Sequence, residues 1–124
     1  MRLLLDTHVV LWWLADDPAL PKEMAAILDI EPEIYISAAT VWEIAIKQSL
    51  GKLPGPENLP ELVRDSEFRL LAITADHAIA AARLPLIHRD PFDRILIAQA
   101  NQQELRLVTH DAMIQRYQVP LLPI

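Results

Sequence analysis

Short runs of apolar residues, set between helix-like segments, limit the folds open to this chain. The first run, Leu3-Leu4-Leu5, contains no polar residue to face solvent, which is the pattern of a strand buried on both faces of a parallel sheet. Comparable runs predict strands over 34–36, 70–73 and 105–109. Residues 119–124 are expected to form a last strand at the sheet edge, because the prolines in it suit only an edge.

Helices are expected between these strands. Their approximate ranges are 8–14, 21–28, 37–48, 61–68, 74–84, 91–103 and 112–117, with a loop over 52–60. The alternation predicts an α/β fold, a three-layer sandwich in which a mostly parallel central sheet is flanked by helices. Because the 124 residues contain no linker, repeat or low-complexity tract, we expect a single domain over 1–124.

Composition excludes several functional classes. A net charge of −6 argues against a protein that coats nucleic acid by bulk electrostatics, but it permits an enzyme that holds metal ions over a few phosphates. The absence of cysteine excludes disulfides, zinc–thiolate sites and thiol nucleophiles. The longest uncharged apolar run, 7–15, is too short to cross a bilayer, and the N-terminal residues do not resemble a signal peptide. We therefore expect a cytoplasmic protein with no membrane segment.

The segment His88–Arg94 concentrates two acids, two arginines and a histidine in seven residues. Proline disfavours helical geometry in the residue before it and is tolerated in the first helical turn. Asp90 is therefore predicted to be a helix N-cap, Pro91 the first helical residue, and Asp93 a first-turn acid. Carboxylates in such places gain about 0.3–1 kcal/mol each from the helix dipole. Taken alone, the segment is explained as well by a capped helix as by a functional site.

Acidic side chains from distant parts of the chain are expected to meet at one sheet edge. Asp6 and Asp111 come just past the carboxyl ends of predicted strands, and Glu43 and Asp93 lie in the first turns of adjoining helices. In open parallel sheets, these positions share the edge where sites are built.

Each acid also has a simpler interpretation. Asp6 could only cap a helix, and Asp111 could be an ordinary turn residue. Glu43 could form a capping box with Thr40, or an ion pair with Lys47 worth about 0.2–0.5 kcal/mol. That all four acids have only structural roles and still meet at one edge is less probable than that any one of them does.

A cluster of carboxylates has a chemical consequence. Neighbouring carboxylates repel and raise one another's pKa unless a cation neutralises them. Oxygen ligands without cysteine favour Mg²⁺, with Mn²⁺ also possible, over zinc. Such ions polarise a phosphate and supply a hydroxide nucleophile, so the sequence predicts metal-dependent phosphodiester hydrolysis.

Four segments in order resemble PIN-domain ribonucleases of the VapC type, the toxins of type II toxin–antitoxin systems. The segments are Leu3–His8, Ser37–Glu43, His88–Ala100 and Leu107–Asp111, so the resemblance spans essentially the whole chain. A modest departure is His110, where relatives often carry arginine.

The resemblance implies a catalytic acidic quartet made of Asp6, Glu43, Asp93 and Asp111, with Asp6 and Asp93 as direct metal ligands and Thr40 beside the site. It also implies magnesium-dependent endoribonuclease action on RNA, a homodimer, and inhibition by a cognate antitoxin that covers the cleft.

The remaining charged residues of the central segment are assigned supporting roles. Asp90 is expected to shape the turn rather than to join the site. Arg94 is expected to pair with the neighbouring acids, whereas Arg89 either pairs with an acid or reaches a phosphate. The histidines near the edge, His8, His88 and His110, are expected to be polar supports rather than ligands.

Tryptophans could stack bases. Trp12 and Trp13 cannot both point inward on one helix, so one of them is expected to meet a partner chain. Trp42 is expected in the core.

Three other functions remain open at this stage. A non-catalytic interaction module on a PIN scaffold is the most serious of them. A receiver-like signalling domain needs an acidic pair after its first strand and a late lysine, but Asp6 precedes Thr7-His8 and the last lysine is Lys52. A phosphatase with an aspartate nucleophile would want an acid at position 8.

Overall fold

One parallel sheet organises the computed structural model, which describes residues 1–124. Its strands are β1 (Arg2–Leu5), β2 (Glu33–Ser37), β3 (Arg69–Leu71), β4 (Arg106–Thr109) and β5 (Leu121–Pro123), arranged β3-β2-β1-β4-β5. Every neighbouring pair is parallel, and β5 lies at the edge. The predicted α/β class and the proline-containing edge strand are therefore confirmed.

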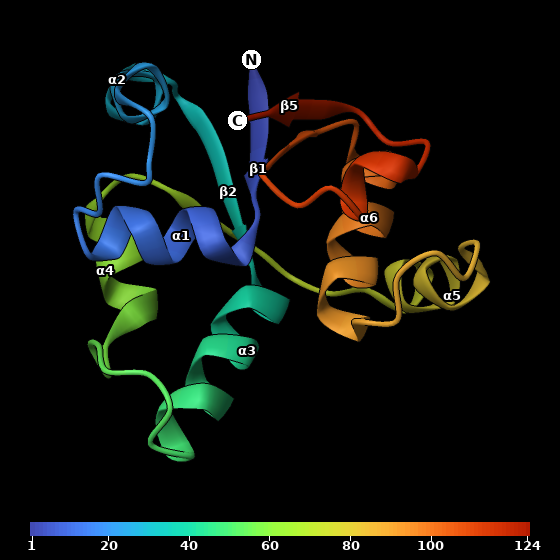
Figure 1. Cartoon of the computed structure of the whole chain (residues 1–124), viewed down its shortest axis with the longest axis horizontal. Coiled ribbons are helices and arrows are strands. Elements are labelled where there is room, and N and C mark those ends of the chain that lie inside the picture. The colour runs from blue at the N-terminus through green and yellow to red at the C-terminus, as the bar shows by residue number, and fades with distance from the viewer.

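Helices lie on both faces of the sheet (Figure 1). One side carries α1 (Thr7–Leu14), α2 (Lys22–Ile30) and α4 (Leu59–Asp65), and the other carries α5 (Ala75–Arg83) and α6 (Pro91–Gln103). From the carboxyl end of β2, α3 (Ala38–Ser49) extends in contact with both α1 and α6. A 3₁₀ turn (Ile114–Arg116) precedes β5. None of these helices combines the length and apolar character needed to cross a membrane.

The central strand shows why its sequence is continuously apolar. Leu3 and Leu5 belong to the core under α1, α2 and α4, whereas Leu4 belongs to the second core, under α6. All three leucines are fully buried. Because successive side chains of a strand point to opposite faces, two helical layers require apolar residues at every position.

Some helix boundaries in the structure differ from the predicted ones. α4 begins at Leu59 instead of residue 61 and ends at Asp65, which shortens the expected 52–60 loop. Pro60 is accepted within this helix because the N–H it lacks would have no partner in a first turn.

The expectation that Trp42 lies in the core is wrong. Its side chain is 61% exposed on α3, where it contacts the ring of Phe92 edge-on at 5.1 Å between centroids. The apolar residues that face the sheet from α3 are Ala39 and Ile44 instead.

The start of α3 also excludes the capping box that was one interpretation of Thr40 and Glu43. Ser37 is the N-cap, and its Oγ accepts a hydrogen bond from the Ala39 N–H at 3.0 Å. Thr40 is consequently the third helical residue, and its side chain is fully buried. The three-residue spacing from Thr40 to Glu43 is compatible with a capping box and with a pair that faces inward, and the structure has the second arrangement.

Replacing the observed cap tests this assignment. Ser37→Ala should lower the free energy of unfolding by about 0.5–2 kcal/mol, because the Ala39 N–H loses its acceptor. Ser49→Ala, at the exposed end of the same helix, is the matched control and should change it by less than about 0.5 kcal/mol. Chemical denaturation measures both, and equal losses would contradict the cap.

Candidate active site

Asp6 lies where the first strand ends and the first helix begins, and it is 2% exposed. Its Oδ1 accepts the His8 N–H at 3.1 Å, which caps α1. Its Oδ2 accepts the Thr109 hydroxyl at 2.5 Å, which ties it to the end of β4. Asp6 therefore caps a helix and also lies at the carboxyl edge, so the two interpretations of this residue are compatible.

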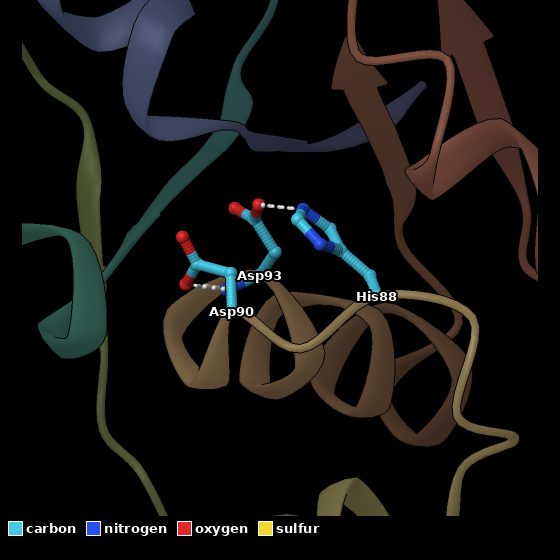
Figure 2. Close-up of side chains that lie close together, drawn as sticks. All are labelled: His88, Asp90 and Asp93. Atoms are coloured by element: carbon cyan, nitrogen blue, oxygen red, sulfur yellow. Dashed lines mark hydrogen bonds and ion pairs between the residues drawn. The ribbon is translucent and has the colours of Figure 1, made fainter.

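The start of α6 contributes two further carboxylates. Asp90 Oδ1 accepts the N–H groups of Phe92 (2.9 Å) and Asp93 (3.2 Å), so the predicted cap is confirmed. Its second oxygen points to the same side as the Asp93 carboxylate (Figure 2). One ligand atom from each of His88, Asp90 and Asp93 lies within 4.8 Å of the others. Asp90 therefore shapes the turn and also borders the site.

His88 is the residue that connects the acids, and the sequence analysis left it among the supports. Its Nε2 lies 2.7 Å from Asp93 Oδ2 and 3.7 Å from Asp111 Oδ2. These are ion-pair distances, and the shorter contact joins the buried Nε2 directly to the Asp93 carboxylate. Asp111 uses Oδ1 to accept the Met113 N–H at 2.7 Å, which leaves Oδ2 facing the histidine. The available signal was the place of His88 within the charged segment.

Glu43 is hydrogen-bonded to the hydroxyl of Thr7, the residue that follows Asp6. The Thr7 hydroxyl donates to Glu43 Oε1 at 2.9 Å and lies 3.1 Å from the Thr40 hydroxyl. Because the single Thr7 proton goes to the carboxylate, Thr40 must donate to Thr7. The other Glu43 oxygen accepts from Lys47 at 3.2 Å, as the spacing predicts. Glu43 is therefore anchored beside Asp6 but is not part of the close group around His88.

The acids raise one another's pKa. Burial raises the pKa of Asp6, opposed by the hydrogen bond from Thr109. Burial is also the main cause that raises the pKa of Asp93 to about 7. Repulsion from Asp90 and Asp6 adds to this effect, and His88 opposes it.

The group fits a divalent cation. Its donors are carboxylate oxygens and an imidazole nitrogen, which suits Mg²⁺ or Mn²⁺, with the nitrogen better matched to Mn²⁺. A cation there would stabilise the ionised form of each acid. His88, Asp90 and Asp93 are the residues that would hold it.

Arg94 does not pair with the acids, so that expectation is wrong. Its guanidinium points instead to the end of α5, where helix carbonyls have no partner within the helix. The main acceptors are the carbonyl oxygens of Ala81 (2.8 Å), Leu84 (3.0 Å), Pro85 (3.0 Å) and His88 (3.2 Å). Arg89, by contrast, is exposed and makes no ion pair or side-chain hydrogen bond, so it is available to a phosphate.

Tyr117 completes the support of His88. Its hydroxyl accepts the N–H groups of Ile87 (3.2 Å) and His88 (2.7 Å) and donates to the Pro85 carbonyl at 2.8 Å. Arg94 and Tyr117 together fix residues 84–88 and hold the histidine against the acids.

Comparison with known proteins identifies the family of the chain. A family model described as "PIN domain" matches residues 3–120. The chain belongs to the PIN domain family. Among curated proteins, this PIN domain is 29% identical to Ribonuclease VapC22 of Mycobacterium tuberculosis over 126 residues, covering 95% of the chain and 93% of that protein. It is 40% identical to Ribonuclease VapC16 of the same organism over 67 residues, about half of each protein.

Solved structures share the PIN fold. A DNA-bound VapBC from Salmonella typhimurium superimposes with a TM-score of 0.74 at 18% identity, covering 99% of this chain and 98% of that one. A toxin–antitoxin complex from Klebsiella pneumoniae gives 0.72 at 18% identity, covering 98% and 96%. The fold implied by the resemblance is confirmed.

The raised pKa of Asp93 predicts a pH-dependent stability difference in the metal-free PIN domain. Its ordinary value of 3.8 describes the unfolded chain, so between 3.8 and about 7 the folded state binds more protons. Stability therefore falls as pH rises through this window, and the penalty is complete above it. With chelator present, Asp93→Asn should melt at a higher temperature than wild type at about pH 8 and at a similar temperature at about pH 4.

Glu57→Gln, in an exposed loop, is the control and should shift the melting temperature little at either pH. Saturating Mg²⁺ should reduce or reverse the difference, because it stabilises wild type through binding. An Asp93→Asn variant less stable than wild type at about pH 8 without metal would contradict the repulsion.

The hydroxyl of Tyr117 can be removed on its own. Tyr117→Phe should lower the free energy of unfolding by about 1–3 kcal/mol, because two N–H groups lose their acceptor. Tyr35→Phe, whose hydroxyl contacts only exposed charged side chains, is the matched control at less than about 0.5 kcal/mol. The amide hydrogen of His88 should exchange faster in Tyr117→Phe and not in Tyr35→Phe, because only the first variant removes its acceptor. Unchanged exchange in Tyr117→Phe would refute this role of the hydroxyl.

Proposed function

We propose that this PIN domain is a magnesium-dependent endoribonuclease that acts as the toxin of a toxin–antitoxin pair. The observation that carries the proposal is the close group of His88, Asp90 and Asp93 at the carboxyl edge of the sheet, with Asp6 near enough to add to the raised pKa of Asp93. Relatives named as ribonucleases, and neighbours in structure named as toxin–antitoxin complexes, support it.

In this proposal Asp6 and Asp93 are the principal metal ligands, and Asp90 and His88 complete the donor set. Mg²⁺, or Mn²⁺ in its place, supplies Lewis acidity toward a phosphodiester and lowers the pKa of water. The carboxylates are held ready for this task, since Asp6 accepts hydrogen bonds from His8 and Thr109 on its two oxygens.

The other residues position the substrate and the water. Glu43 and Asp111 accept hydrogen bonds from the attacking water, and Thr7, with Thr40 behind it, fixes the Glu43 carboxylate. Arg89, which is exposed and unpaired, contacts a phosphate oxygen. The exposed His110 borders Asp111 and lies near the RNA path.

The partners follow from the same comparison. A cognate antitoxin binds the chain and blocks the cleft, as the complexes named among the neighbours in structure suggest. Exposed apolar side chains such as Ile79 and Leu86 support contact between two copies in a homodimer. RNA and antitoxin meet the chain in the cytoplasm.

Removing a metal ligand tests the function directly. Purified wild-type protein should cleave RNA with Mg²⁺ and not with chelator. Asp6→Asn and Asp93→Asn should each lose more than about 100-fold in cleavage rate. Mutation of residues that only hydrogen-bond a metal ligand already costs about 10–100-fold in metal affinity or activity, and a direct ligand should cost more. Glu57→Gln should retain full activity, and circular dichroism should show each variant folded.

Two results would contradict this assignment in different ways. Full activity of Asp6→Asn or Asp93→Asn would remove these residues from the catalytic site. A wild-type protein inactive on varied RNAs with either Mg²⁺ or Mn²⁺ would favour the non-catalytic interaction module.

A further inference from the structure

A small cavity adjoins the acids on the side of α1. It has a volume of about 290 Å³ and is lined by Asp6, His8, Trp12, His110 and Asp111. Two of these residues belong to the proposed catalytic group. The other three, His8, Trp12 and His110, have no role in the proposed chemistry. The cavity therefore has two acids on one side and an aromatic wall, formed by these three rings, on the other.

Trp12 is not needed by the core. Its neighbour Trp13 packs against Phe68 with ring centroids 4.8 Å apart and contacts the core between the sheet and α1. Adjacent helical residues point about 100° apart, so only one of the two can face that core. Trp12 lies instead beside the rings of His8 at 6.3 Å and His110 at 6.1 Å.

The wall is fixed in place relative to the acids. Trp12 and His8 belong to α1, whose N-cap is Asp6. His110 directly precedes Asp111, and its Nδ1 is within hydrogen-bond distance of the Ile124 carbonyl. A group bound against Trp12 is therefore held close to whatever Asp6 and Asp111 bind.

The dimensions and chemistry favour a flat aromatic ring. A volume of about 290 Å³ lies just below the range of about 300–1,000 Å³ typical of sites for drug-sized ligands. An indole offers a stacking face to any base, whatever its sequence, and such stacking is worth about 1–3 kcal/mol per base. A base inside a duplex has no free face, so the ligand must be unpaired.

We propose that Trp12, flanked by His8 and His110, stacks one unpaired base of RNA next to the phosphodiester held at the acids. The inference rests on the proposed ribonuclease function and deepens it. The substrate is single-stranded RNA at the cleavage position, and Trp12 is a binding residue that sets the position of the chain without reading a particular base.

An abasic scan tests the subsite. An oligoribonucleotide that wild type cleaves once is prepared with each nucleotide near the cut replaced in turn by an abasic one. Wild type should lose about 5- to 150-fold in kcat/KM at one position, the loss that 1–3 kcal/mol represents. Trp12→Leu should show a loss of this size on intact RNA and little further loss on the abasic RNA, whereas Trp12→Phe should retain most of the wild-type behaviour.

Trp42→Leu is the matched control, because Trp42 is exposed and lies outside this cavity. It should keep the wild-type penalty at the abasic position. If Trp12→Leu keeps that penalty too, or cleaves intact RNA as wild type does, the subsite is wrong while the ribonuclease function stands. If wild type cleaves no RNA, the proposed function fails, and the subsite fails with it.

A second measurement applies if Trp12→Leu does not fold. In Asp93→Asn protein that also carries Trp13→Phe and Trp42→Phe, Trp12 is the only tryptophan left. Intact RNA should quench its fluorescence, and RNA abasic at the sensitive position should do so much less. Equal quenching by both RNAs would overturn the proposal.

Discussion

Repulsion among carboxylates at the carboxyl edge of the sheet is the interaction on which the rest of this structure depends. Asp6 is almost completely buried, and Asp90 and Asp93 share a space of a few ångströms with His88. Burial, with repulsion from Asp90 and Asp6 added to it, raises the pKa of Asp93 to about 7. No gain in stability explains such an arrangement, because the acids would be better solvated apart. Strongly perturbed carboxyl groups of this kind are typical of functional sites.

Three of the acids combine a structural role with a place at the site. One oxygen of Asp6, Asp90 or Asp111 accepts backbone N–H groups at the start of a helix or turn. The opposite oxygen faces the site or is oriented toward it by a neighbouring side chain. Capping and site formation are therefore not alternatives in this chain. The rigid base for both is the central strand, whose buried leucines join two cores.

Local rules predicted the features that local interactions decide. The run Leu3–Leu5 predicted a strand covered on both faces, and the Asp90-Pro91 pair predicted where α6 begins. Parallel topology predicted that distant acids would meet at one edge. Features set by tertiary contacts were missed: Arg94 follows unpaired helix carbonyls rather than the nearby acids, and Tyr117 reaches His88 across 29 residues. Spacing alone also could not tell which face of α3 is covered, so Trp42 was wrongly assigned to the core.

We propose that these crowded acids hold a divalent cation. Electron paramagnetic resonance of Mn²⁺ titrated into metal-free protein measures this without reference to any RNA. Wild type should remove free Mn²⁺ from solution in a saturable manner, with Mg²⁺ competing for the same site, and Asp6→Asn/Asp93→Asn should bind far more weakly. Equal Mn²⁺ binding by wild type and the double variant would contradict the account.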